Sequence, residues 1–90
     1  MATVYIPAAM RPAAGGATEA VVPGRTLGEV IENLEAAYPG LKSRLAQEDR
    51  LRPGLAAFVN GVSVPPGLST RVPEDAEIYF APAIAGGRSE

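Results

Sequence analysis

Cysteine and histidine are both absent from the 90 residues of this chain. Without cysteine the chain has no thiol nucleophile and no thiolate metal ligand, and without histidine it lacks the commonest general base near neutral pH. Carboxylates remain, but the adjacent pairs Glu48 with Asp49 and Glu74 with Asp75 lie in turn-like sequence, which is typical of solvated surface. We therefore expect that the chain is not an enzyme, has no catalytic residue and binds no metal or cofactor.

Clusters of positive charge and long apolar runs are also missing. Eight basic and ten acidic residues give a net charge of −2, and the basic residues are spread from Arg11 to Arg88. Such spacing does not form a nucleic-acid-binding patch. The opening MATVYIPAAM lacks the charged region and sustained apolar region of a secretory signal, and no apolar run is long enough for a membrane span. We expect a cytoplasmic protein without nucleic-acid or membrane partners.

The apolar fraction of 47%, with ten glycines and nine prolines, is typical of one small globular domain with short elements and many turns. Residues 3–7 are β-branched and aromatic and predict a first strand, and residues 19–22 predict a second. The segment between them contains Gly15 and Gly16, which we interpret as the turn of a hairpin with a long connection.

A helix follows, because Thr26 and Glu29 have the spacing of a capping box. An apolar stripe then recurs at helical spacing, which predicts packing against a sheet. Its members are Leu27, Val30, Ile31, Leu34 and Tyr38. Pro39 and Gly40 should end this helix, and residues 41–47 predict a shorter helical piece.

Asn60 and Gly61 are the strongest hairpin signal in the chain, because both positions of a type I′ turn need positive φ. Residues 77–82 predict a final strand, in which Ile78 and Phe80 face the helix. The order of elements predicts an α+β fold of the β-grasp type, a mixed sheet of about five strands packed on one main helix. The last strand should lie at the centre of the sheet beside the first. We expect a domain of residues 1–82 and a flexible tail of residues 83–90.

These residues resemble the ubiquitin-like sulfur-carrier family, which includes the small subunit of molybdopterin synthase and the thiamine-pathway sulfur carrier. The likeness is greatest to the mycobacterial-type carriers that serve cysteine biosynthesis. The resemblance covers essentially residues 1–87, and four segments carry it in order: 6–16, 26–45, 58–61 and 78–87.

The resemblance implies chemistry at Gly87. In this family an E1-like enzyme uses ATP to adenylate the terminal carboxylate, and sulfide then replaces the nucleotide to give a thiocarboxylate that donates sulfur to a sulfide-accepting synthase. The preceding Ile84, Ala85 and Gly86 would form the tail that enters the partner. Because glycine has no Cβ, a Gly-Gly end can pass through a narrow channel. Extended, residues 83–87 would reach about 17 Å.

Arg88, Ser89 and Glu90 depart from the family pattern, because active members end at the second glycine. Here the Gly87 carbonyl is held in an amide bond to Arg88. An amide cannot be adenylated, so the chain as written is expected to be an inactive precursor. We predict cleavage between Gly87 and Arg88, by a protease such as a zinc-dependent JAMM-type enzyme.

Phe58 and Tyr79 should lie on the face of the sheet opposite the helix, where they would form a docking surface rimmed by arginine and glutamate. The alternative is that one of the two rings packs under residues 65–71. The chain is expected to be a monomer. Two other functions stay open: a ubiquitin-like modifier conjugated to lysines through Gly87, and the small subunit of a molybdopterin synthase.

Overall fold

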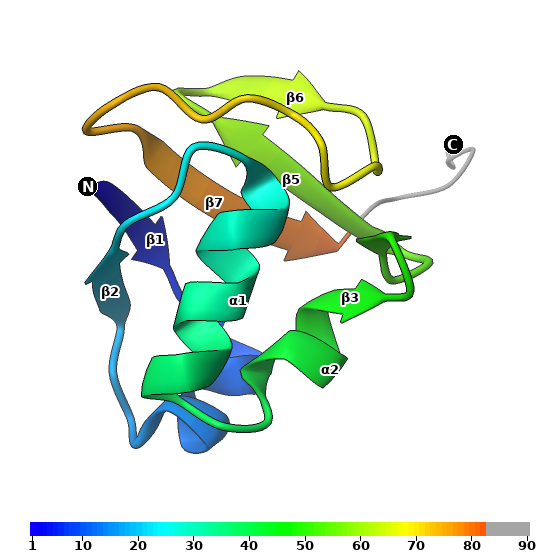
Figure 1. Cartoon of the computed structure of the whole chain (residues 1–90). Helices are drawn as coiled ribbons and strands as arrows, with labels where there is room; N and C mark the ends of the chain where they lie inside the picture. Colours follow the sequence, from blue (N-terminus) through cyan, green and yellow to red (C-terminus); the bar gives the residue numbers. More distant parts are fainter. Residues whose placement is uncertain (83–90) are drawn as a thin grey trace.

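The computed structural model describes residues 1–82 of the chain as a five-stranded mixed sheet with helix α1 (Leu27–Ala37) across one face (Figure 1). The strand order is β2-β1-β7-β5-β6, so the last strand in sequence is the middle strand of the sheet. The expected β-grasp fold and the central position of the last strand are both confirmed. The strands are β1 (Ala2–Tyr5), β2 (Glu19–Val22), β5 (Leu55–Val59), β6 (Val62–Val64) and β7 (Glu77–Pro82).

Strands β1 and β2 form the expected antiparallel hairpin, but its connection has more structure than the sequence indicated. It contains a 3-10 helix, η1 (Ala8–Ala14), which Gly15 ends in a left-handed conformation at φ 64°. The Arg11 side chain also ties this helix to the end of β1, since its Nε donates to the carbonyl of Ile6 at 3.1 Å. Short alanine-rich helices of this kind carry little periodic signal, so the sequence predicted only a flexible connection.

Helix α1 begins where the capping residues predicted. The Thr26 hydroxyl accepts a hydrogen bond from the Glu29 N–H at 3.2 Å, and the Glu29 carboxylate accepts one from the Arg25 N–H at 2.8 Å. The second bond goes one residue further back than in a standard capping box. Together the two hydrogen bonds pair the N–H groups of Arg25 and Glu29 at the start of α1.

The apolar stripe of α1 is the part of the helix that packs on the sheet. Its fully buried members are Leu27, Val30, Ile31 and Leu34. Tyr38 is only partly buried, because the helix ends at Ala37 and Tyr38 is its C-cap. All of the buried side chains in residues 1–82 are apolar, so the core holds no charge that needs a partner.

The second helix is shorter than expected. Helix α2 covers Leu41–Leu45, whereas the sequence predicted helix over residues 41–47. The last two residues of the predicted helix, Ala46 and Gln47, instead form strand β3, which pairs with β4 (Arg50–Leu51) in a small separate hairpin. The hydrophobic spacing of such a short segment cannot separate the end of a helix from a two-residue strand.

Strand β7 is paired on both sides. It runs parallel to β1, with Tyr5 opposite Tyr79, and antiparallel to β5, with Leu55 opposite Pro82. Ile78 and Phe80 are buried beneath α1, as the alternation of residues 77–82 predicted. This strand is therefore fixed by hydrogen bonds on both edges and by packing on one face.

The β5–β6 hairpin turns at Asn60 and Gly61, whose φ values of 51° and 82° are both positive, as the predicted turn requires. Asn60 also holds the start of β7. Its side-chain oxygen accepts from the Glu77 N–H at 2.9 Å, and its own N–H donates to the Glu77 carbonyl at 2.8 Å. The turn therefore sets the register between β5 and the central strand.

None of the helices in residues 1–82 has the length and apolar character that a membrane crossing needs.

Replacing Gly61 with alanine tests the turn, because a Cβ added there meets no other atom within 4 Å while the φ of 82° disfavours any side chain. We expect Gly61→Ala to lower the free energy of unfolding by about 1–2 kcal/mol in urea denaturation, from backbone strain alone. The matched control is Gly67→Ala, where the space is equally open and φ is not positive. Its effect should stay within about 0.5 kcal/mol. Equal losses in both variants would contradict the assigned turn.

Candidate functional site

The residues predicted to carry the chemistry lie outside the described part of the chain. These are Ile84, Ala85, Gly86, Gly87 and Arg88, whereas the structure describes residues 1–82. What the structure does establish is the starting point of that segment. It follows Pro82, the last residue of β7, and Gly87 comes five residues later in the sequence.

Strand β7 therefore anchors the segment that leads to Gly87. The first half of β7 pairs with both β1 and β5, and its Pro82 end stays paired with β5, where Leu55 is opposite Pro82. Because Ile78 and Phe80 are also buried, this end of the strand cannot move without breaking the β5 ladder and disturbing the core. Central strands have low exposure and the highest local stability in such folds. A partner that binds the domain would thus receive the following residues from a fixed point.

The predicted docking residues Phe58 and Tyr79 lie together on the face of the sheet that α1 does not cover. They are directly opposite one another in the β5–β7 ladder, Tyr79 is 43% exposed, and Phe58 is half-buried. Residues 65–71, the alternative cover for one of the rings, lie on the other side. There the carbonyls of Leu68 and Thr70 accept hydrogen bonds from the first turn of α1.

A third aromatic residue, Tyr5, belongs to the same surface and was missed by the sequence analysis. Its ring stacks on that of Tyr79, with the ring centroids 4.4 Å apart and the planes inclined by 10°. The alternation of β1 carried the signal, since Val4 and Ile6 are buried and Tyr5 must then point the other way. Tyr5, Tyr79 and Phe58 form one row across β1, β7 and β5, which we call the aromatic row.

The charged groups that the five strands place on this face are both acidic. Glu19 is opposite Tyr5 in the β1–β2 ladder, and Glu77 precedes Tyr79 by two residues on the same side of β7. Burial raises the pKa of the Tyr5 phenol above its ordinary value of 10, and the charge of Glu77 raises it further. Two glutamates thus lie beside the aromatic row, and none of the five strands contributes the expected arginine.

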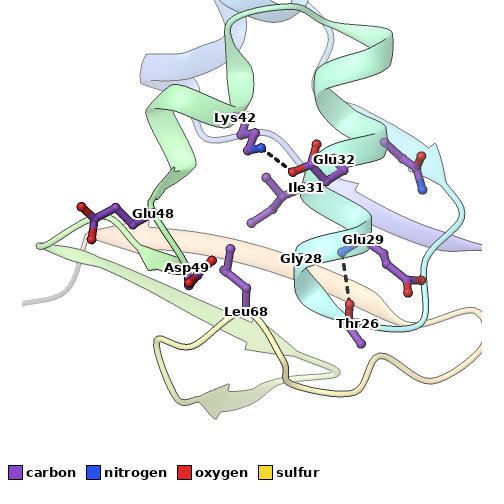
Figure 2. Close-up of a pocket in the computed structure, with 10 residues that line it drawn as sticks. Thr26, Gly28, Glu29, Ile31, Glu32, Lys42, Glu48, Asp49 and Leu68 are labelled. Atoms are coloured by element: carbon purple, nitrogen blue, oxygen red, sulfur yellow. Dashed lines mark hydrogen bonds and ion pairs between the residues drawn. The ribbon is translucent and has the colours of Figure 1, made fainter.

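A second feature is an open hollow of about 550 Å³ on the helix side, between α1, α2 and the turn that joins β3 to β4 (Figure 2). Four carboxylates line it, from Glu29, Glu32, Glu48 and Asp49. The basic residue of its lining is Lys42, which donates a hydrogen bond to Glu32. The pair Glu48 and Asp49 is exposed, as predicted.

The pair Glu74 and Asp75 is likewise exposed, and both carboxylates receive the Met1 ammonium, at 2.6 and 3.4 Å. Among residues 1–82, no three aspartate, glutamate, histidine or cysteine side chains lie close enough together to hold a metal ion. Glu32, Glu74 and Asp75 form ion pairs, and the carboxylates of Glu29 and Glu35 accept hydrogen bonds from backbone N–H groups.

The comparisons with known proteins agree with one another. The ThiS family matches residues 4–87. The sulfur carrier protein CysO of Mycobacterium tuberculosis is 40% identical over 92 aligned positions, which cover 94% of this chain and 97% of that protein. Small archaeal modifier protein 3 of Haloferax volcanii is 33% identical over 64 positions, covering 69% of this chain and 70% of that one.

Among solved structures, the crystal structure of the Amycolatopsis orientalis BexX/CysO complex contains a chain that is similar with a TM-score of 0.87 and 32% identity. The match covers 97% of this chain and all of that one. The two CysO proteins therefore match this chain over nearly its full length, and the Mycobacterium tuberculosis relative is named a sulfur carrier protein, a class that is not enzymatic. On the match of residues 4–87, this chain is a member of the ThiS family of ubiquitin-like proteins.

Proposed function

We propose that this chain is a sulfur-carrier protein of the cysteine-biosynthesis type, and that Gly87 is the residue that carries the sulfur. The observation that carries the proposal is the extent of the family match, which runs through the whole domain and stops at Gly87, the second residue of the Gly-Gly pair. The 40% identity to a sulfur carrier protein over nearly the full length supports the same reading.

The proposed chemistry begins with a cut between Gly87 and Arg88, which a JAMM-type metalloprotease could make and which frees the Gly87 carboxylate. That carboxylate attacks the α-phosphate of ATP on an E1-like enzyme, and pyrophosphate leaves. Sulfide then attacks the acyl carbon of the adenylate, AMP leaves, and the product is a thiocarboxylate for a sulfide-accepting synthase. The sulfur is bound to a main-chain carbon, so this chemistry needs neither a cysteine nor a cofactor on the carrier.

The aromatic row is the proposed docking surface for the activating enzyme. Aromatic side chains dominate binding energy at protein interfaces, because they bury a large apolar area at a small cost in side-chain entropy. Tyr79, in the middle of the row, lies on the strand that leads to Gly87, so docking here would fix where the segment with the reacting carbon begins relative to the partner. In the Amycolatopsis structure, a CysO protein is in a complex with BexX, which supports binding of another protein by this fold.

A ubiquitin-like modifier is the second candidate, favoured by the similarity to small archaeal modifier protein 3. It would use the same adenylate but pass Gly87 to a lysine of a target protein. The two functions leave different products in cells: covalent adducts for a modifier, and a free protein with sulfur in place of one oxygen for a carrier.

Processing and activation are tested with three forms of the chain: residues 1–90, 1–87 and 1–86. With the cognate activating enzyme, ATP and sulfide, we expect pyrophosphate release and a thiocarboxylate only from the 1–87 form, since the 1–90 form blocks the Gly87 carboxylate and the 1–86 form lacks it. Intact-mass spectrometry of the protein from its own organism should show a chain that ends at Gly87. A chain that retains Arg88 in every growth condition, together with an inert 1–87 form, would refute the proposal.

Docking is tested by comparing Tyr79→Ala with Phe80→Ala, adjacent aromatic residues that face opposite sides of β7. Tyr79→Ala should weaken binding of the activating enzyme by roughly thirtyfold, the effect of an interface hot spot. It should cost only about 1 kcal/mol of stability, from the lost stack with Tyr5. Phe80→Ala should cost about 3–5 kcal/mol of stability because Phe80 is buried.

Val62→Ala provides the surface control, since Val62 is 65% exposed on the edge strand β6. Its binding and stability should both stay near those of the wild type. If Tyr79→Ala binds the activating enzyme as tightly as Val62→Ala does, the aromatic row is not the docking surface.

A further inference from the structure

The chain is poor in groups that could attack its own activated C-terminus. An acyl-adenylate reacts with amines and thiols as well as with sulfide, and this sequence has no cysteine and no histidine. Lys42 is its only lysine, and its other basic residues are all arginine. Arginine stays protonated at any physiological pH and is no nucleophile there. Hydroxyl groups are weak nucleophiles unless a base activates them, so the amines of Lys42 and of the N-terminus are the strongest nucleophiles that remain.

Lys42 lies in an ion pair at the edge of the open hollow between α1, α2 and the β3–β4 turn. Its Nζ donates a hydrogen bond to Glu32 of α1, as Figure 2 shows. The carboxylates of Glu29, also on α1, and of Glu48 and Asp49, on the β3–β4 turn, line the same hollow. Lys42 is therefore paired with one carboxylate, at the edge of a hollow that three further carboxylates line.

The backbone at Lys42 is held by a second carboxylate, which fixes where the side chain starts. The Glu35 carboxylate accepts hydrogen bonds from the N–H groups of Lys42 and Gly40, at 2.9 and 3.0 Å. The hydrogen bond to Glu32 is the main cause that raises the pKa of the Lys42 ammonium above its ordinary 10.5, and the charges of Glu32 and Glu35 add to it. A protonated amine has no lone pair to attack a carbonyl.

The N-terminal amine is in a similar setting at the other end of the molecule. The Met1 ammonium donates to Glu74 at 2.6 Å and to Asp75 at 3.4 Å. The hydrogen bond to Glu74 is the main cause that raises the pKa of this amine above its ordinary 8.0. Both amines of the chain are thus paired with carboxylates of another segment, which are ten residues away for Lys42 and more than seventy away for Met1.

We propose that these ion pairs protect the carrier from acylating itself, so that its activated C-terminus reacts with sulfide and not with a second copy of the chain. The reaction they suppress is attack of the amine nitrogen on the acyl carbon of the adenylate. In that reaction a C–N bond forms, the bond to the phosphate oxygen breaks, AMP leaves, and the amine proton passes to water. The inference rests on the proposed function, because it matters only if Gly87 is activated.

The test uses a chemical probe, so that it needs no activating enzyme. The full chain is treated with a limiting amount of N-hydroxysulfosuccinimidyl acetate at one fixed pH, and peptide mass spectrometry follows acetylation of Lys42 and of the N-terminus separately. Glu32→Gln removes the negative partner of Lys42 while keeping the size of the side chain. We expect it to raise the acetylation rate of Lys42 by about two- to fivefold, the scale of an exposed ion pair.

The matched control is Glu19→Gln, which removes the same charge from the opposite face of the sheet and should leave the Lys42 rate unchanged. In the Glu32→Gln protein the acetylation rate of the N-terminus should not change, so it is an internal reference. That rate should rise in the double variant Glu74→Gln with Asp75→Asn. High salt should raise the wild-type Lys42 rate toward that of Glu32→Gln, because salt screens exposed pairs. A Lys42 rate that is the same in Glu32→Gln, Glu19→Gln and wild type overturns the proposal.

A second readout separates this inference from the proposed function. With the 1–87 form, activating enzyme and ATP but no sulfide, Glu32→Gln should give more Lys42-linked dimers than wild type. Absence of any adenylation would refute the proposed function and leave the acetylation result standing. Normal adenylation with equal amounts of dimer in both proteins would refute the protection of Lys42 by Glu32 and leave the proposed function standing.

Discussion

Pairing of the last strand at the centre of the sheet is the constraint on which the other features depend. Strand β7 joins the β1–β2 hairpin to the β5–β6 hairpin, and without it these would be two separate hairpins, which are marginal in water. It also buries Ile78 and Phe80 on the face of the sheet that α1 covers (Figure 1). Because this strand ends at Pro82, the segment that leads to Gly87 begins at the strand with the most extensive pairing and burial.

The alternation of side chains along β7 divides the molecule into two functional sides. Phe80 packs into the core and its neighbour Tyr79 lies in the aromatic row, so a shift of one residue in register would bury the aromatic row and expose the core. Asn60 prevents that shift, since it bonds the start of β7 through both its side chain and its backbone. A turn residue thus determines which aromatic rings a partner can reach.

The composition of the chain agrees with a role in which the reacting atom belongs to the main chain. A carrier whose carboxyl group is activated gains nothing from its own thiols or imidazoles, and each free amine is a competing acceptor. The chain has neither cysteine nor histidine and a single lysine, and that lysine is paired with Glu32. Under the proposed function, the exposed pair of Lys42 and Glu32 would therefore bear on which nucleophile the activated carboxyl group meets.

Local signals allowed the sequence to predict much of this fold. Thr26 and Glu29 determine the start of α1 through bonds within a few residues, and Asn60 and Gly61 determine a turn through their own φ angles. Gly87, as the proposed reacting residue, also followed from the sequence, through its resemblance to a family. The sequence could not show which distant groups meet, because such contacts depend on how the strands pair. Tyr5 stacks on Tyr79 across 74 positions, and Lys42 meets Glu32 only after α2 folds back along α1, so these arrangements were decided by the tertiary structure.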